Sequence, residues 1–200
     1  MNEAEFEKKL NIQTAGFQYG FPKLIDYHRY EPTPYEAMEQ LFEQYSLPEH
    51  AHCIDIGCGK GRVPIYLHAK FHVPTKGIEM DQKFFIEAEH NREMYLQKAR
   101  KKHIPIEFLN MLGEKYEIQR KDNVFFFFNP FSIAIFRKVL MNILLSFEQS
   151  PRKIHLILYY PAPDYMQMLQ NDTAFELITE VHLVGKKNEN ERIVVFEMSY

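Results

Sequence analysis

A cluster of glycines follows one short apolar stretch of the chain. Residues 53–56 read Cys-Ile-Asp-Ile, and residues 57–62 read Gly-Cys-Gly-Lys-Gly-Arg. Because glycine has no Cβ, such a stretch can turn sharply and bring its backbone close to a ligand. A helix that begins at its end would add free backbone N–H groups. The pattern favours a ligand-binding loop after a strand, with Asp55 as its acidic residue, over a plain tight turn.

A second carboxylate follows at a spacing that suits a nucleoside. Glu79 comes 22 residues after Gly57, within the sequence Gly77-Ile78-Glu79-Met80-Asp81. A carboxylate in this position can accept hydrogen bonds from both hydroxyls of a ribose in a bidentate arrangement. An acidic residue after a strand is common by itself. Its spacing from the glycines favours ribose binding over a solvated surface role.

Two amide side chains occupy similar positions further along the chain. Asn110 and Met111 follow the third apolar stretch, and Asn129-Pro130-Phe131 follows the apolar residues 124–128. An asparagine side chain offers one acceptor and a donor group to a ligand. Asn-Pro is also a common turn. Each asparagine can therefore offer hydrogen bonds to a ligand, and a simple structural turn is the alternative at both positions.

The elements that carry these residues alternate between strand and helix. Strands are predicted at 53–56, 75–79, 104–109, 124–128 and 154–160, with helices between most of them. Pro105 breaks the third strand early, which predicts an edge position in the sheet. The first helix is predicted to begin at Thr33-Pro34-Tyr35-Glu36, with Thr33 as its cap and Glu36 closing a capping box. Asp81 and Ser132 are expected to cap later helices.

The last two predicted strands, near 175–184 and 192–198, flank a polar turn and are typical of an antiparallel hairpin. The whole pattern predicts an α/β fold, a doubly wound, mostly parallel seven-stranded sheet with helices on both faces and a C-terminal antiparallel hairpin. Ligands of such sheets bind at the carboxyl ends of the strands, where each motif above falls.

The glycine loop resembles the nucleotide-binding loop of class I S-adenosylmethionine-dependent methyltransferases, usually an acidic residue followed by G-x-G-x-G. The resemblance covers roughly residues 30–200 and implies that the cofactor is S-adenosyl-L-methionine. It places Glu79 at the ribose, Met80 against the adenine ring and Asn110 at the adenine amino group. The implied cofactor-binding residues are Asp55, Gly57, Cys58, Gly59, Gly61, Arg62, Glu79, Met80, Asn110 and Met111.

The stretch Phe128-Asn129-Pro130-Phe131 resembles the [D/N]-P-P-[Y/F] motif of methyltransferases that modify amino or amide nitrogens. The resemblance implies that Asn129 accepts hydrogen bonds from the target nitrogen and that Phe131 packs against the acceptor. The implied catalytic residues are Asn129, Pro130 and Phe131. This chain lacks the second proline of the motif, which leaves a protein lysine, a nucleobase and a small molecule open as acceptors.

Two other functions remain open. Nicotinamide-dependent oxidoreductases carry G-x-G-x-x-G/A, whereas the last of these positions is Arg62 here and the third glycine comes one place early. A catalytically silent cofactor-binding domain would keep Gly57, Gly59 and Glu79 but transfer nothing.

Composition limits the setting in which the chain works. Its 200 residues suffice for one packed domain, and 24 Lys and Arg against 27 Asp and Glu give no overall basic charge of the kind expected for nucleic-acid binding. Cys53 and Cys58 are the two cysteines, which favours a reducing cytoplasm. We expect no membrane span, and the nine histidines show no metal-binding spacing, so we expect no metal.

The first residues differ from the rest of the chain. We interpret residues 1–32 as an N-terminal arm and residues 33–200 as the methyltransferase domain. The arm is expected to cover the cofactor as a lid, or simply to pack against the domain through its aromatic residues. The expected wall residues are Tyr19, Tyr27, Tyr30 and Tyr35.

Overall fold

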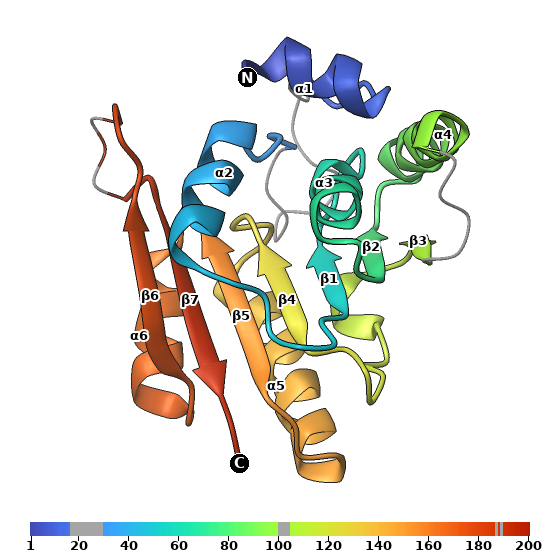
Figure 1. Ribbon diagram of the computed structural model, residues 1–200. Helices are drawn as coiled ribbons and strands as arrows, with labels where there is room; N and C mark the ends of the chain where they lie inside the picture. The colour runs from blue at the N-terminus through green and yellow to red at the C-terminus, as the bar shows by residue number, and fades with distance from the viewer. Residues whose placement is uncertain (17–29, 100–104, 187, 189) are drawn as a thin grey trace.

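The computed structural model describes residues 1–16, 30–99, 105–186, 188 and 190–200. These residues contain a seven-stranded sheet in the order β3-β2-β1-β4-β5-β7-β6 (Figure 1). The first five strands in this order are parallel, whereas β7 is antiparallel to both β5 and β6. The predicted fold class is therefore confirmed. The strands are β1 (Cys53–Ile56), β2 (Thr75–Glu79), β3 (Ile106–Asn110), β4 (Val124–Phe127), β5 (Ile154–Tyr159), β6 (Glu176–His182) and β7 (Arg192–Met198).

Helices pack on both faces of the sheet and bury two separate apolar clusters. One face is covered by α2 (Tyr35–Gln44), α3 (Arg62–Phe71) and α4 (Gln82–Ala99). The other is covered by α5 (Ile133–Gln149) and α6 (Pro163–Asp172). A short 3₁₀ helix, η1 (Gly113–Lys115), lies between β3 and β4 in the chain. A sheet with helices on both faces is what the alternation of strands and helices predicts.

The central strand β4 shows why the sheet is buried on both faces. All four of its residues are buried. Phe126 belongs to the cluster under α2, α3 and α4, whereas Phe125 and Phe127 belong to the cluster under α5 and α6. Successive side chains of a strand point to opposite faces, so an uninterrupted apolar run supplies both cores.

Several predicted boundaries are confirmed. Strands β1 and β2 have the predicted limits, and β3 lies at the edge of the sheet directly after Pro105. The Asp81 side chain caps α4, because its Oδ1 accepts a hydrogen bond from the Lys83 N–H at 2.8 Å.

The Thr33 cap is wrong, and the Ser132 cap is confirmed in position but not in its hydrogen bond. Helix α2 begins at Tyr35 with Pro34 as N-cap, and no side chain of the cap accepts a hydrogen bond from the helix. The Tyr35 N–H instead donates to Glu3 Oε1 at 2.8 Å, so the orphan donor of the first turn is satisfied from another helix. Ser132 is the N-cap of α5, but its side chain makes no capping hydrogen bond.

The sequence analysis missed the first helix, α1 (Glu3–Leu10). It begins with a capping box in which the Glu5 N–H donates to Asn2 Oδ1 and the Asn2 N–H donates to Glu5 Oε2, both at 2.9 Å. The spacing Asn-x-x-Glu was a signal for this start. Figure 1 shows α1 beyond the carboxyl ends of the parallel strands.

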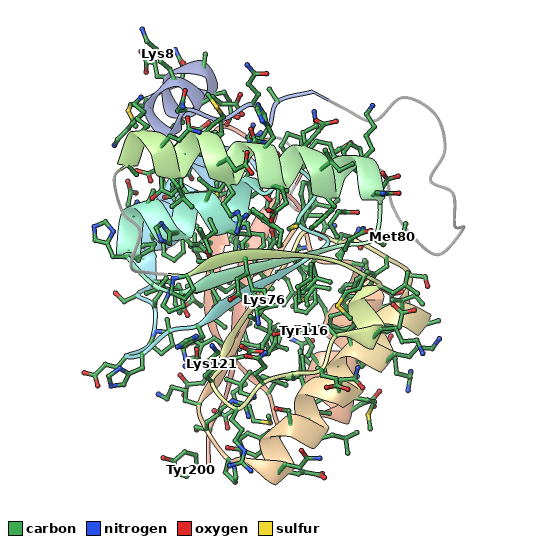
Figure 2. All side chains as sticks on the ribbon, turned by 90° about the vertical axis from the view of Figure 1, so that its right-hand side faces the viewer. Lys8, Lys76, Met80, Tyr116, Lys121 and Tyr200 are labelled. Carbon is green, nitrogen blue, oxygen red and sulfur yellow. The ribbon has the colours of Figure 1, made fainter. Side chains whose placement is uncertain are left out.

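A buried polar network joins the amino end of β2 to the residues before β4 at the edge of the sheet opposite α1. Figure 2 shows Lys76 and Tyr116 near each other inside the molecule, and the Lys76 ammonium donates to the Tyr116 hydroxyl at 3.0 Å. That hydroxyl donates to Asp122 Oδ2 at 2.7 Å. Lys76, Tyr116 and Asp122 are therefore linked to one another, as the members of a structural network are. In the part of the chain that the structure describes, no helix has the length and apolar character needed to cross a membrane.

Candidate active site

The glycine loop joins β1 to α3 through three left-handed backbone positions. Gly57, Gly59 and Gly61 have φ values of 88°, 53° and 82°, which side chains with a Cβ rarely adopt. The N–H groups of Gly57 and Cys58 both donate to the Ile78 carbonyl, at 2.8 and 3.0 Å. The loop is thereby tied to the carboxyl end of β2, where Glu79 follows.

Two glycines let other segments approach the loop closely. A Cβ built on Gly57 would lie 2.7 Å from Pro130 Cβ, and a Cβ built on Gly59 would lie 2.1 Å from the Tyr30 ring. The turn after β4 and the end of the arm therefore both pack on the glycine loop. The predicted cofactor loop and the predicted acceptor turn are brought into direct contact.

Glu79 helps to hold the loop in place. Its Oε2 accepts a hydrogen bond from the Gly59 N–H at 2.8 Å, and its Oε1 accepts one from the Asp81 N–H at 2.7 Å. The side chain is buried, and burial raises the pKa of the carboxyl above its usual value, although the hydrogen bonds from Asp81 and Gly59 oppose the shift.

Asp55 is a second buried carboxyl beside Glu79. Burial, reinforced by the charge of Glu79, raises its pKa well above the usual value. Among the described residues, the Asp55 carboxylate makes no ion pair and no hydrogen bond. Two buried carboxyls at a loop, balanced by no cation of the described residues, favour a positively charged ligand when they are ionised.

Cys58 lies in the same buried environment. Burial and the charges of Asp55 and Glu79 raise the pKa of its thiol well above the usual value, so the thiol stays protonated and unreactive at neutral pH. Cys58 and Cys53 are both free and buried. Within the described residues, no group of three or more His, Cys, Asp or Glu is arranged to hold a metal ion.

The ends of β2 and β3 form one wall of the site. The Asn110 amide donates to the carbonyls of Glu79 and Met80, at 2.9 and 3.2 Å, and the Met111 N–H donates to the Glu79 carbonyl at 3.0 Å. Asn110 thus fixes the backbone beside Glu79 through its NH₂ group. Met80, labelled in Figure 2, follows the end of β2 and is only half-buried.

The turn after β4 contains Asn129 and Phe131, whose side chains lie in different surroundings. Asn129 has a left-handed φ of 38°, a conformation that asparagine tolerates better than most residues. The prediction that Phe131 packs against the acceptor is wrong, because its ring is 1% exposed in the apolar cluster under α5. The Tyr165 hydroxyl donates to the Phe131 carbonyl, which holds the turn against α6.

The guanidinium of Arg62 points to the N-terminal arm, which corrects the prediction that it binds the cofactor. The side chain is 3% exposed. It donates to Thr14 Oγ1 at 2.6 Å and to the Thr33 carbonyl at 3.0 Å, and it forms ion pairs with Glu3 and Glu7. All of these partners lie in residues 1–33, so Arg62 fastens the arm to the start of α3.

The predicted wall residues of the arm fall into three groups. Tyr30 covers Gly59, as predicted for a wall residue, and its hydroxyl donates to the Thr14 carbonyl at 2.6 Å. Tyr35 is fully buried and stacks on Phe6 with ring centroids 4.6 Å apart, so it is a core residue. Tyr19 and Tyr27 lie outside the described residues.

Sequence reasoning missed a groove beside this site. It has a volume of about 940 Å³ and lies between α1, α2 and the ends of β4 and β5. Phe128 and Tyr159 contribute to its lining, and their ring centroids are 4.5 Å apart. The sequence did show that Phe128 precedes Asn129, but only the fold shows which elements surround it.

Comparisons with known proteins show the fold. No family model matches the sequence, and no curated protein matches it either. The chain is similar in structure to an RNA methyltransferase from Salinibacter ruber in complex with S-adenosyl-L-homocysteine, with a TM-score of 0.59, 18% identity, and 84% of this chain and 94% of that one covered.

Two further solved structures agree over nearly the whole chain. A putative RNA methyltransferase from Pyrococcus horikoshii has a TM-score of 0.59 and 18% identity, and covers 99% of this chain and 98% of its own. The human methyltransferase 10 domain containing protein has a TM-score of 0.63 and 10% identity, and covers 98% and 93%. Together with the strand order and the C-terminal hairpin, these similarities show that the chain has the class I, Rossmann-like methyltransferase fold.

Proposed function

We propose that this chain is an S-adenosylmethionine-dependent methyltransferase that transfers a methyl group to a nitrogen atom. The observation that carries the proposal is the pair of buried carboxyls, Asp55 and Glu79, at the glycine loop, with the Asn129-Pro130 turn packed on Gly57. S-adenosylmethionine supplies a methyl group already activated on a sulfonium. A cationic cofactor suits two carboxylates that no described cation balances.

The same charges argue against a nicotinamide cofactor. A pyrophosphate placed on this loop would come close to the buried Asp55 carboxyl, which has the same sign of charge when ionised. The cation at the start of α3, Arg62, is already used by Glu3 and Glu7. A dinucleotide site needs the opposite arrangement, with backbone N–H groups and positive charge facing the phosphates.

Each part of the site has a role in this proposal. Glu79 accepts hydrogen bonds from the ribose hydroxyls, Asp55 attracts the ammonium group and Met80 lies beside the adenine. Gly57, Cys58, Gly59 and Gly61 form the loop, with Asn110 and Met111 as the adenine wall. Both cysteines are free thiols, which suits the cytoplasm that we expect as its location.

Asn129 positions the acceptor nitrogen in this proposal, and Pro130 fixes its turn against the loop. Aligning two reactants is the main task when the leaving group is already activated, and it can supply roughly 7–11 kcal/mol at best. A catalytically silent cofactor-binding domain would not have to align two reactants, and a turnover assay distinguishes such a domain from an enzyme. We keep residues 33–200 as the methyltransferase domain and residues 1–32 as an arm that Arg62 holds in place.

The acceptor is the open part of the proposal. Two of the structural neighbours are named as RNA methyltransferases, so a nucleobase is the acceptor that the comparisons suggest. A protein lysine presents a nitrogen that the same Asn129 turn can hold.

Calorimetric titration with S-adenosylmethionine, S-adenosylhomocysteine and NAD tests the cofactor. We expect the first two to bind and NAD to give no heat of binding. The affinity for S-adenosylmethionine should rise with pH, because raised pKa values leave Asp55 and Glu79 partly protonated at low pH and only the ionised carboxyls attract a cation. An Asp55→Asn variant should lose part of this pH dependence. Binding of NAD alone would overturn the proposal.

Replacing Asn129 by glycine is expected to lower turnover about tenfold or more while cofactor affinity stays the same. The fold-change corresponds to one positioned hydrogen bond. Glycine is chosen because it accepts the left-handed φ of 38° without strain, and Asn129→Asp, which retains an acceptor oxygen, serves as the conservative comparison. Single-turnover methyl transfer and calorimetry measure the two quantities. Unchanged turnover in Asn129→Gly would remove Asn129 from the mechanism.

A further inference from the structure

The groove beside the site reaches the residue that precedes the proposed acceptor turn. Phe128, which lines it, is the residue directly before Asn129. Tyr159, at the end of the neighbouring strand β5, lines it too. Since parallel strands β4 and β5 end at the same edge of the sheet, a substrate that lies in this groove can present an atom to Asn129.

The charges that line the groove are mostly negative. Among the described residues, its lining contains the six glutamates 3, 31, 36, 39, 43 and 191 and two positively charged side chains, Arg62 and Lys186. Arg62 is paired with Glu3, and Lys186 with Glu191 at 2.7 Å. Lys70, outside the lining, pairs with Glu39 at 2.6 Å.

Three carboxylates of the lining are left without a cation. Glu31, Glu36 and Glu43 are exposed and form no ion pair with any residue that the structure describes. Their charges add to one another in a concave surface, where the surrounding protein concentrates the field. The groove is therefore a negative surface with room for an extended ligand.

This charge is the wrong sign for RNA. An RNA strand carries one negative charge per nucleotide, and proteins that bind it line their grooves with Lys and Arg. The half-buried Phe128 ring can stack on a base, with the buried Tyr159 ring packed behind it. The carboxylates around the groove would nevertheless repel the RNA backbone. A lysine side chain fits both features, because its aliphatic stem packs on apolar rings while its ammonium group stays near carboxylates.

We propose that the groove binds a positively charged segment of a polypeptide and that the methyl acceptor is the Nζ atom of a lysine in that segment. The proposal rests on the proposed function and adds its substrate class. The lysine ammonium first loses a proton to water. Its lone pair then forms the N–C bond as the C–S bond breaks, which leaves a neutral thioether and a methylated, positively charged lysine.

A binding experiment compares two labelled probes on the full chain. One probe is a nine-residue peptide of alternating lysine and glycine, and the other is a twelve-nucleotide oligouridine, both followed by fluorescence anisotropy in the same buffer. The groove variant is Glu36→Gln/Glu43→Gln. The control is Glu117→Gln/Glu148→Gln, which removes the same number of exposed charges outside the groove lining.

We expect the peptide to bind more tightly than the oligouridine. The groove variant should weaken peptide binding about tenfold and the control less than about twofold, since only the first changes local complementarity. With methyl-labelled S-adenosylmethionine, label should enter lysine of the peptide. Tighter binding of oligouridine, label in RNA alone, or equal effects of the two variants would overturn the proposal.

Calorimetric titration of the same proteins with S-adenosylmethionine tests the cofactor proposal independently of the peptide-binding groove. Retained cofactor binding in both variants places any loss of peptide binding in the groove. If the unmodified chain binds the peptide through Glu36 and Glu43 but does not bind S-adenosylmethionine, the cofactor proposal fails while the cationic-ligand groove is supported.

Discussion

Replacing Glu79 by alanine is expected to weaken the binding of S-adenosylmethionine about 100-fold. The carboxylate is proposed to accept hydrogen bonds from two ribose hydroxyls, and each hydrogen bond to a charged group contributes about 1.5–3 kcal/mol. Alanine also leaves the N–H groups of Gly59 and Asp81 without their acceptor, which loosens the loop. Isothermal titration calorimetry of the purified variant measures the change in affinity.

Two further variants show whether the change in affinity is due to the charge of Glu79. Glu79→Gln retains an oxygen for the Gly59 N–H but loses the charge, so its affinity should lie between those of the alanine variant and the unmodified chain. Glu93→Ala removes an exposed carboxylate from α4, away from the loop, and should change nothing. If Glu79→Ala kept its circular dichroism spectrum and bound the cofactor as tightly as before, the assignment of Glu79 to the ribose would be wrong.

The sequence predicted most of the fold because local signals agreed with one another. The apolar run at 124–128 had no polar alternation, which predicts a strand buried on both faces, and β4 is such a strand. Gly57, Gly59 and Gly61 indicated a sharply turning loop, and the structure shows positive φ at all three. These features depend on a few neighbouring residues, so a single sequence is enough to recognise them.

The direction of a side chain was harder to predict, because it depends on residues far away in the chain. Arg62 follows the glycine loop directly, yet its guanidinium contacts Glu3 and Glu7, more than fifty positions earlier. Phe131 follows Asn129-Pro130 in the order of the acceptor motif, yet its ring is buried under α5. Motif spacing fixes where a backbone segment lies but leaves open which of its side chains enter the core.

The negative charge of the groove was equally hard to predict from the sequence. The whole chain is close to neutral, with 24 basic and 27 acidic residues, which suggests no partner. Its acidic lining is assembled from α1, the residues before α2, α2 itself and the turn before β7. Only the folded chain brings these glutamates to one surface.

Replacing Arg62 by methionine is expected to lower the free energy of unfolding by about 1.5–3 kcal/mol, the contribution of a hydrogen bond to a charged group. The Glu3 side chain left behind is 50% exposed, so water can solvate its charge, whereas Glu7 is mostly buried. Methionine retains the apolar stem, so the loss falls on the charge and its hydrogen bonds. Glu3, Glu7 and the Thr33 carbonyl would lose their shared donor. Urea denaturation followed by circular dichroism measures the change.

Lys60→Met is the matched control, two positions away and also in an ion pair. Lys60 contacts Glu87 at 2.9 Å, but both side chains are partly exposed, so the loss should stay below about 1 kcal/mol. Equal effects of the two substitutions would show that Arg62 is no anchor. Since α3 begins at the glycine loop and Tyr30 covers Gly59, an Arg62→Met protein that remains folded should also bind S-adenosylmethionine more weakly. That coupling would show that the arm fastened by Arg62 is part of the cofactor site.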